Sequence, residues 1–163
     1  MERSYLALDP SDLRRLGELA AADRANLFAR RRGTGEIYEG RLFAVALCQG
    51  SALHYINGKN GIKDFDVWSF YTESAVRRFP ARRIGKADFG DPKFGVTPDS
   101  PHLTGRRVDL IGRSIRDADP NAPVASLRRY LREQRTETAR LLALKAVVLI
   151  EPDALLGTIV WPA

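Results

Sequence analysis

The residues best suited to chemistry in this sequence are two aspartates on either side of a phenylalanine, Asp64-Phe65-Asp66. In a β-strand, residues two apart point to the same side, with Cα atoms about 6.5–7 Å apart, whereas Phe65 points the other way. Two carboxylates on one side of a strand can hold divalent cations, because Mg²⁺ favours carboxylate oxygens as ligands. The pair therefore predicts a metal site on the surface of a sheet.

A third carboxylate from a neighbouring strand would complete such a site, and Asp109 is the candidate. It lies within an apolar, β-prone run, RRVDLIGRSI at 106–115, where an acid has no evident packing role. Three other aspartates are rivals for this role: Asp88, Asp91 and Asp99. Each rival stands among glycines and prolines, where aspartate is a common turn residue. We therefore expect Asp109 to join the pair.

A D-x-D pattern alone is weak, because a second example occurs at Asp117-Ala118-Asp119. That pair precedes a proline and a helical pattern, so a role at the start of a helix is the better interpretation. The first pair has a different context, since an apolar run upstream of it ends in Gln49-Gly50-Ser51. Gly50 leaves room for a phosphate, and the helix expected from Ser51 offers free backbone N–H groups to bind it.

These features occur in a particular order: a β-prone run ending in Gly50-Ser51, a twelve-residue spacer, Asp64-Phe65-Asp66, and a single acid on a third strand. The order resembles that of the DNA polymerase beta-like nucleotidyltransferase superfamily, in a small, minimal form covering about residues 40–115. Two departures exist. Gln49 is polar where the family has an apolar residue, and the NGKNG stretch brings the spacer near its long limit. A P-loop is excluded, because the sequence has no G-x-x-x-x-G-K-[ST] motif.

The resemblance implies metal-dependent roles for the three acids. Asp64 and Asp66 would hold two Mg²⁺ ions, and Asp109 would complete one metal site and help to deprotonate an attacking hydroxyl. Metal charge would also allow three neighbouring carboxylates to remain ionised, because unpaired like charges raise one another's pKa. The acids therefore serve both as the predicted catalytic residues and as the predicted metal ligands.

The resemblance also implies a nucleotide-binding role for Gly50 and Ser51, which would hold the triphosphate, with Lys63 close enough to reach the phosphates. For Lys59, an ordinary solvated loop position is the better interpretation. The reaction would move a nucleoside monophosphate from a nucleoside triphosphate to a hydroxyl, with pyrophosphate leaving. Because about 50 residues follow Asp109, we expect the acceptor to be a small molecule or a partner protein. Some minimal members act as antitoxins that modify a HEPN-type partner.

Composition limits the other functions. The chain has 163 residues and a net charge of +6, but its basic residues come as scattered pairs rather than as a nucleic-acid-binding tail. Its apolar runs are too short to span a bilayer. One cysteine and no signal-like N-terminus favour a cytoplasmic protein without a disulfide or a membrane role. Two alternatives stay open: a non-catalytic nucleotide- or partner-binding module of the same fold, and a basic nucleic-acid-binding domain.

The elements that must position these residues follow from local patterns. Asp9 as N-cap and Pro10 at the first position predict an amphipathic helix over 10–32 that ends near Gly-Thr-Gly at 33–35. The other predicted elements are a doubly buried strand within RLFAVALCQG at 41–50, a short helix after Ser51, strands at 63–71 and 106–115, loop-like structure over 85–105, and a C-terminal helical region at 122–163 that ends in a short strand. We expect a single α/β domain of the α+β type, with a small mixed sheet flanked by helices.

Three other features have structural interpretations beside functional ones. Cys48, in an apolar run, is a small core residue rather than a nucleophile. His54 lies one helical turn after Ser51 and could face a nucleotide, but a packed, hydrogen-bonded histidine is the better interpretation. The segment KADFGDPKFG at 86–95 suits a substrate-facing flap and a packed excursion equally well.

Overall fold

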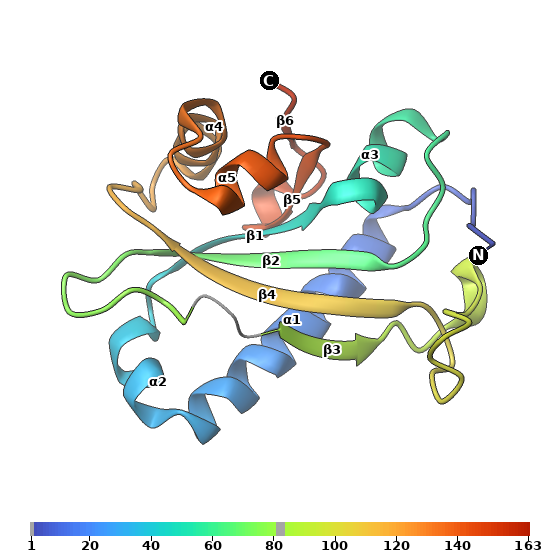
Figure 1. Cartoon of the computed structure of the whole chain (residues 1–163), viewed down its shortest axis with the longest axis horizontal. Coiled ribbons are helices and arrows are strands. Elements are labelled where there is room, and N and C mark those ends of the chain that lie inside the picture. Colours follow the sequence, from blue (N-terminus) through green and yellow to red (C-terminus); the bar gives the residue numbers. More distant parts are fainter. Residues whose placement is uncertain (1, 81–83) are drawn as a thin grey trace.

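The computed structural model describes residues 2–80 and 84–163. Within these ranges the chain forms a mixed sheet with helices on both faces (Figure 1). The helices are α1 (Pro10–Arg30), α2 (Arg32–Tyr38), α3 (Gln49–Asn57), α4 (Pro123–Glu133), α5 (Glu137–Leu142) and the 3-10 turns η1 (Pro92–Phe94) and η2 (Asp153–Leu155). The strands are β1 (Leu42–Cys48), β2 (Phe65–Thr72), β3 (Ile84–Asp88), β4 (Arg107–Ile115), β5 (Val147–Glu151) and β6 (Ile159–Trp161). The expected α/β class with a mixed sheet is confirmed.

The sheet has the order β3-β4-β2-β1-β5-β6 in the described part of the chain. Only the β2–β4 pair is parallel, while the other neighbouring strands run antiparallel. A parallel pair needs a crossover connection, and the chain between β2 and β4 supplies it while adding β3 at the edge. The crossover brings the starts of β2 and β4 to the same end of the sheet, where β1 ends and α3 begins (Figure 1).

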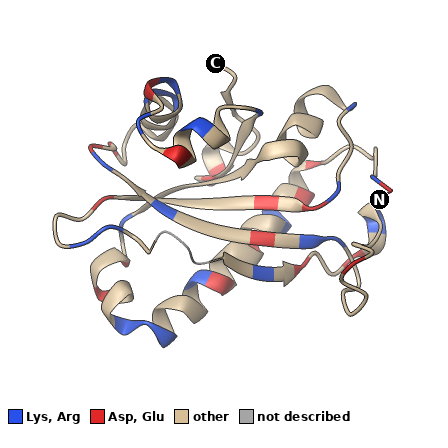
Figure 2. Ribbon diagram, in the orientation of Figure 1, with Lys and Arg blue, Asp and Glu red and all other residues tan. Residues whose placement is uncertain are grey.

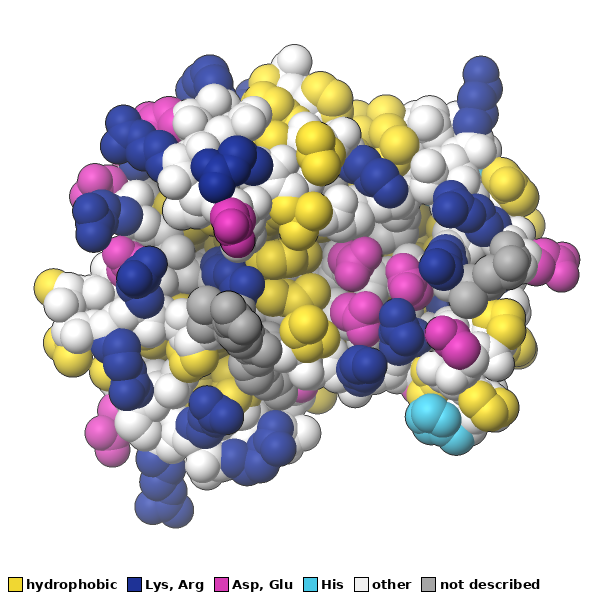
Figure 3. Space-filling model, viewed as in Figure 1, with side chains coloured by type: hydrophobic (Ala, Val, Ile, Leu, Met, Phe, Trp, Pro, Cys, Tyr) yellow, Lys and Arg dark blue, Asp and Glu magenta, His cyan; other side chains and the backbone are white. Residues whose placement is uncertain are grey.

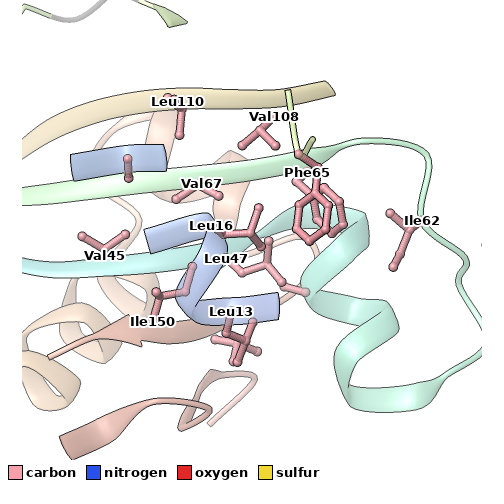
Figure 4. Packing of buried hydrophobic residues seen from close by; sticks show 14 of the residues in the cluster. Leu13, Leu16, Val45, Leu47, Ile62, Phe65, Val67, Val108, Leu110 and Ile150 are labelled. Atoms are coloured by element: carbon pink, nitrogen blue, oxygen red, sulfur yellow. The ribbon is translucent and has the colours of Figure 1, made fainter. Parts of the chain in front are cut away.

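One face of the sheet packs against α1 and α3. Leu13 and Leu16 of α1 meet Val45 and Leu47 of β1 in this layer, which Figure 4 shows from close by. The side chains of Leu16 and Leu47 have no exposed surface, and burial of each such side chain contributes about 1.5–3 kcal/mol to folding. This layer therefore fixes β1, and with it the turn into α3.

The opposite face packs against α4 and α5. Leu127 and Leu131 of α4 and Leu142 of α5 are buried over alternate residues of the central strands, including Phe70. Strand β1 is buried on both faces, as its continuous apolar sequence predicts. The two C-terminal helices leave the end of the sheet near the starts of β2 and β4 uncovered (Figures 1 and 3).

Helix α1 begins as predicted but ends differently. Asp9 accepts a hydrogen bond from the Asp12 N–H at 3.0 Å, and the Asp12 carboxylate accepts one from the Asp9 N–H at 2.9 Å, with Pro10 in the first turn. The prediction that Gly-Thr-Gly at 33–35 terminates the helix is wrong, since α1 ends at Arg30 and α2 runs through that stretch. A β-carbon on Gly35 would lie 3.0 Å from Cβ of Phe28, so glycine here permits close helix packing.

The segment expected to be loop-like over 85–105 contains strand β3 and the 3-10 turn η1. Phe89 and Phe94 are buried, and their rings lie 5.3 and 5.6 Å from that of Phe65. Of the two interpretations of residues 86–95, the packed excursion is therefore the one observed. The region 122–163 is only half helical, because β5 and β6 extend the sheet beyond β1, and the apolar residues of β5 are buried on both faces. In the described residues no helix is long and apolar enough to cross a membrane.

Candidate functional site

A single row of residues crosses the sheet at its uncovered end. Cys48 pairs with Asp66, Asp66 with Asp109, and Asp109 with Lys86. Directly paired residues share a face, so the two aspartates and Lys86 project from the same side of the sheet as α4 and α5. Acidic residues gather here at the starts of β2 and β4 (Figures 2 and 3). The parallel register thus places an acid of the D-x-D motif directly beside the predicted third acid.

Arg107 lies between the acids. Its Nη2 donates to Oδ2 of Asp64 at 3.0 Å, and its Nε lies 3.2 Å from Oδ1 of Asp109. All three side chains are mostly buried, with exposed fractions of 18–24%. The second contact is close but poorly aligned, because neither Nε of Arg107 nor Oδ1 of Asp109 has a hydrogen bond within the described structure. The three predicted acids therefore converge, with one guanidinium inside their cluster.

The cluster changes the acidity of its members. Burial, followed by the charges of Asp64 and Asp109, raises the pKa of Asp66 to about 7, against the opposing effect of Arg107 and Lys145. Burial also raises the pKa of Asp109, although Arg107 acts in the opposite direction. A carboxylate with such a pKa lacks enough positive charge around it. A cation bound beside these carboxylates would therefore lower their pKa and stabilise their ionised form.

Arg106, the neighbour of Arg107, fixes the chain just before the cluster. It is 3% exposed and donates to three carbonyl oxygens: Lys63 at 3.2 Å, Phe94 at 2.6 Å and Glu2 at 2.8 Å. Because Lys63 directly precedes Asp64, this network sets the backbone position from which Asp64 projects. Sequence reasoning gave Arg106 no role, since a buried arginine cannot be recognised from a local pattern.

The turn from β1 into α3 has an unusual backbone. Gln49 has φ of +63°, a left-handed conformation that costs a residue other than glycine about 1 kcal/mol or more. Its N–H donates to the carbonyl of Ala146 at 3.1 Å, which ties the turn to the start of β5. No side chain of the described residues caps α3, so the N–H groups that follow Gln49, those of Gly50 and Ser51, have no side-chain cap to bind them. The start of α3 is therefore suited to an anion.

The predicted phosphate-binding residues differ in their positions. Ser51 is 3% exposed and its hydroxyl donates to the Cys48 carbonyl at 3.2 Å, which leaves backbone N–H groups as the donors of this turn. A β-carbon on Gly50 would lie 3.0 Å from Nδ2 of Asn60, which itself donates to the Gly50 carbonyl at 2.9 Å. The NGKNG stretch therefore packs against the turn. Lys63 is exposed beside the acids.

Lys145 is the cation that sequence reasoning missed. Its Nζ lies 3.8 Å from the position of a β-carbon on Gly50, and its charge lowers the pKa of Asp66. The residue precedes Ala146, whose carbonyl binds Gln49, so the backbone holds Lys145 beside the turn. Nothing local in the sequence indicated this position, because Lys145 enters the site only through the pairing of β5 with β1.

The acids fit a divalent cation by chemistry rather than by their present spacing. Carboxylate oxygens are the expected Mg²⁺ ligands, and Oδ1 of Asp109 is a buried oxygen without a hydrogen bond. Within the described residues, however, no group of three or more His, Cys, Asp or Glu side chains is spaced to hold a metal ion. Arg107 takes an oxygen of Asp64 and faces one of Asp109. Metal binding would therefore require this pairing to open.

The remaining candidates have structural roles. His54 is 1% exposed, and its Nε2 bonds the Leu6 carbonyl at 2.9 Å while Nδ1 accepts from the Gly61 N–H at 2.9 Å. Cys48 is buried, and burial raises the pKa of its thiol, which disfavours the nucleophilic thiolate. Among the rivals of Asp109, Asp88 accepts three backbone N–H groups. These residues hold the fold and leave the cluster to the three predicted acids.

An apolar row lies next to the acids on the same face. Trp68 follows Asp66 by two residues and pairs with Ile111 of β4. The guanidinium carbon of Arg113 lies 5.3 Å from the Trp68 ring centre, and the indole N–H of Trp68 has no hydrogen bond within the described residues. Trp68 is only 5% exposed, whereas Ile111 is partly exposed, and apolar side chains adjoin the acidic ones on this surface (Figure 3). Comparisons with protein-family models, with curated proteins and with solved structures found no match to this chain.

Proposed function

We propose that the protein is a Mg²⁺-dependent nucleotidyltransferase that moves a nucleoside monophosphate from a nucleoside triphosphate to a hydroxyl acceptor. The observation that carries the proposal is the register Cys48–Asp66–Asp109. It sets two carboxylates side by side and places the uncapped start of α3 at the end of the adjacent strand. Metal-binding oxygens and an anion-binding helix end are both needed for nucleotidyl transfer, and here they meet at one end of the sheet.

In this proposal, Asp64, Asp66 and Asp109 hold the metal, which offsets phosphate charge when it is bound. The backbone N–H groups of Gly50 and Ser51 bind the triphosphate. Binding both the nucleotide and the acceptor at one site contributes to catalysis, because it removes the entropy cost of their encounter.

Two residues, Lys145 and Asp109, have more specific roles in this proposal. Lys145 lies beside Gly50 at the start of α3. We therefore assign to Lys145 the phosphate contact that was first expected of Lys63. Asp109, whose pKa is raised by burial, is the acid expected to take the proton of the attacking hydroxyl. A base whose pKa lies above the usual aspartate range holds a proton better at neutral pH.

The acceptor is proposed to be a small molecule or a partner protein. The residues after Asp109 form α4, α5, β5 and β6, which pack on the sheet and build no separate acceptor-binding unit in the described structure. The partly exposed Ile111 beside the acids would then contact the acceptor or the base. A non-catalytic binding module and a nucleic-acid-binding domain are the alternatives to be separated by experiment.

The test is calorimetric titration of a non-hydrolysable ATP analogue, and then its GTP, CTP and UTP counterparts, with Mg²⁺ and with chelator. Asp66→Asn/Asp109→Asn should abolish the Mg²⁺-dependent part of binding. The chain supplies a matched control in its second D-x-D motif, so Asp117→Asn/Asp119→Asn should bind like the wild type. Nucleotide binding that ignores metal and both double substitutions would instead support a non-catalytic module. Salt-dependent binding of random DNA or RNA, without nucleotide binding, would support the third alternative.

A further inference from the structure

The acid cluster already contains a cation of its own. Arg107 reaches Asp64 through Nη2 and Asp109 through Nε, at 3.0 and 3.2 Å. The guanidinium therefore occupies the space between two of the three acids that would hold a metal. Lys86 and Lys145 also face the cluster, but neither makes an ion pair within the described residues, and Lys86 is exposed.

The geometry of these contacts is poor for a purely structural bridge. Arginine binds a carboxylate best through two parallel N–H donors, which here are divided between two residues. The Nε of Arg107 and the Oδ1 of Asp109 are buried, close together and without a hydrogen bond. Burying charged groups costs several kcal/mol per ion, and imperfect alignment offsets less of that cost. The contacts of Arg107 with Asp64 and Asp109 are therefore weak enough for another cation to replace the guanidinium.

We propose that Arg107 is the counter-ion of the metal-free cluster, that a divalent cation displaces it from Asp64 and Asp109, and that the released guanidinium then binds a phosphate of the nucleotide. The inference rests on the proposed function and adds a regulatory step to the same site. A metal ion and a guanidinium repel each other and compete for the same oxygens. Once displaced, the planar guanidinium is suited to bidentate binding of phosphate.

The proposal predicts that one substitution has opposite effects on metal binding and on nucleotide binding. In Arg107→Gln the competing cation is gone, so the protein should bind Mn²⁺ alone about tenfold more tightly than the wild type does. The same variant has lost a phosphate contact, so the ATP analogue at saturating Mn²⁺ should bind about tenfold more weakly. A residue with a merely structural role would weaken both.

The experiment measures Mn²⁺ binding by electron paramagnetic resonance and binding of the ATP analogue by calorimetry. Arg116→Gln is the matched control, because Arg116 is an exposed arginine just beyond β4 that pairs with Glu73 and not with the acids of the cluster, so its substitution should change neither affinity. Arg107→Lys provides a second variant if Arg107→Gln does not fold. Its shorter, compact ammonium cannot bridge both acids, so Mn²⁺ should again bind more tightly than to the wild type.

Three outcomes would overturn the inference. If wild type binds Mn²⁺ and nucleotide, but the Arg107 variants bind Mn²⁺ equally or more weakly, Arg107 does not compete with the metal. If Mn²⁺ binds more tightly and nucleotide affinity is unchanged, the released arginine does not reach a phosphate. If wild type binds neither ligand at any concentration tested, the proposed function fails as well, and the two failures are thereby distinguished.

Discussion

Asp66→Asn should stabilise the metal-free protein, although it removes a residue of the proposed site. The substitution keeps the shape of the side chain and deletes the charge that burial and the neighbouring acids oppose. The pKa of Asp66 is raised from the usual 3.8 to about 7, which is about three pKa units. At 1.36 kcal/mol per unit, the ionised carboxylate costs the folded protein at most about 4 kcal/mol.

The sign of the pH dependence follows from proton uptake. Below about pH 4 the carboxyl is protonated in both the folded and the unfolded chain, so it imposes no penalty. Between about pH 4 and pH 7 the folded state holds the proton more tightly, so this group lowers the free energy of unfolding as the pH rises. Above pH 7 the full penalty applies. The difference between Asp66→Asn and wild type should therefore grow from pH 4 to pH 7 and then level off.

Thermal melting in chelator from pH 4 to pH 8.5 measures this difference. For a domain of this size 1 kcal/mol corresponds to about 3 °C, so Asp66→Asn should melt up to about 12 °C above wild type at pH 8 and close to it at pH 4. Asp117→Asn, outside the cluster, should melt like the wild type throughout. Added Mg²⁺ should narrow the gap at pH 8 by stabilising wild type alone. A variant less stable than wild type at pH 8, or a gap independent of pH, would refute the reasoning.

Three further predictions test other parts of the structure. Lys145→Ala should weaken Mg²⁺-dependent binding of the ATP analogue about tenfold in calorimetry, because a charge-assisted phosphate contact is lost; Lys59→Ala should bind like wild type, and equal effects of the two would contradict the assignment. Asp88→Asn should cost about 2 kcal/mol in denaturant unfolding at pH 7, since the carboxylate accepts three backbone N–H groups. Burial raises the pKa of Asp88, but the three bonds outweigh this effect and lower it. The contribution of Asp88 to stability should therefore fade as the pH falls below about 4. An unchanged denaturation midpoint for Asp88→Asn at pH 7 would count against this prediction. Gly112→Ala should destabilise the protein by about 1–3 kcal/mol, because its β-carbon would overlap the Phe79 ring, and an unaltered midpoint would show that the ring can move aside.

Local sequence patterns were enough to predict most of the elements that carry the site, although β2 begins at Phe65 and leaves Asp64 just before the strand. Asp9 and Pro10 indicated the start of α1 because capping depends on residues within one turn. The apolar run within 41–50 indicated a buried strand, since a strand buried on both faces has apolar residues at consecutive positions. The two-residue spacing of Asp64 and Asp66 and the apolar surroundings of Asp109 likewise identified three acids that the structure brings together.

The tertiary structure decided which other residues surround those acids. Lys145 lies 95 positions after Gly50 and meets it only because β5 pairs with β1. The place of Arg107 between Asp64 and Asp109 depends on the parallel register of β2 and β4, which no local pattern specifies. Spacing within one strand is set by backbone geometry, whereas contacts between strands depend on crossover and register. The sequence by itself therefore determined the acids of the candidate site, and the fold determined the cations that surround them.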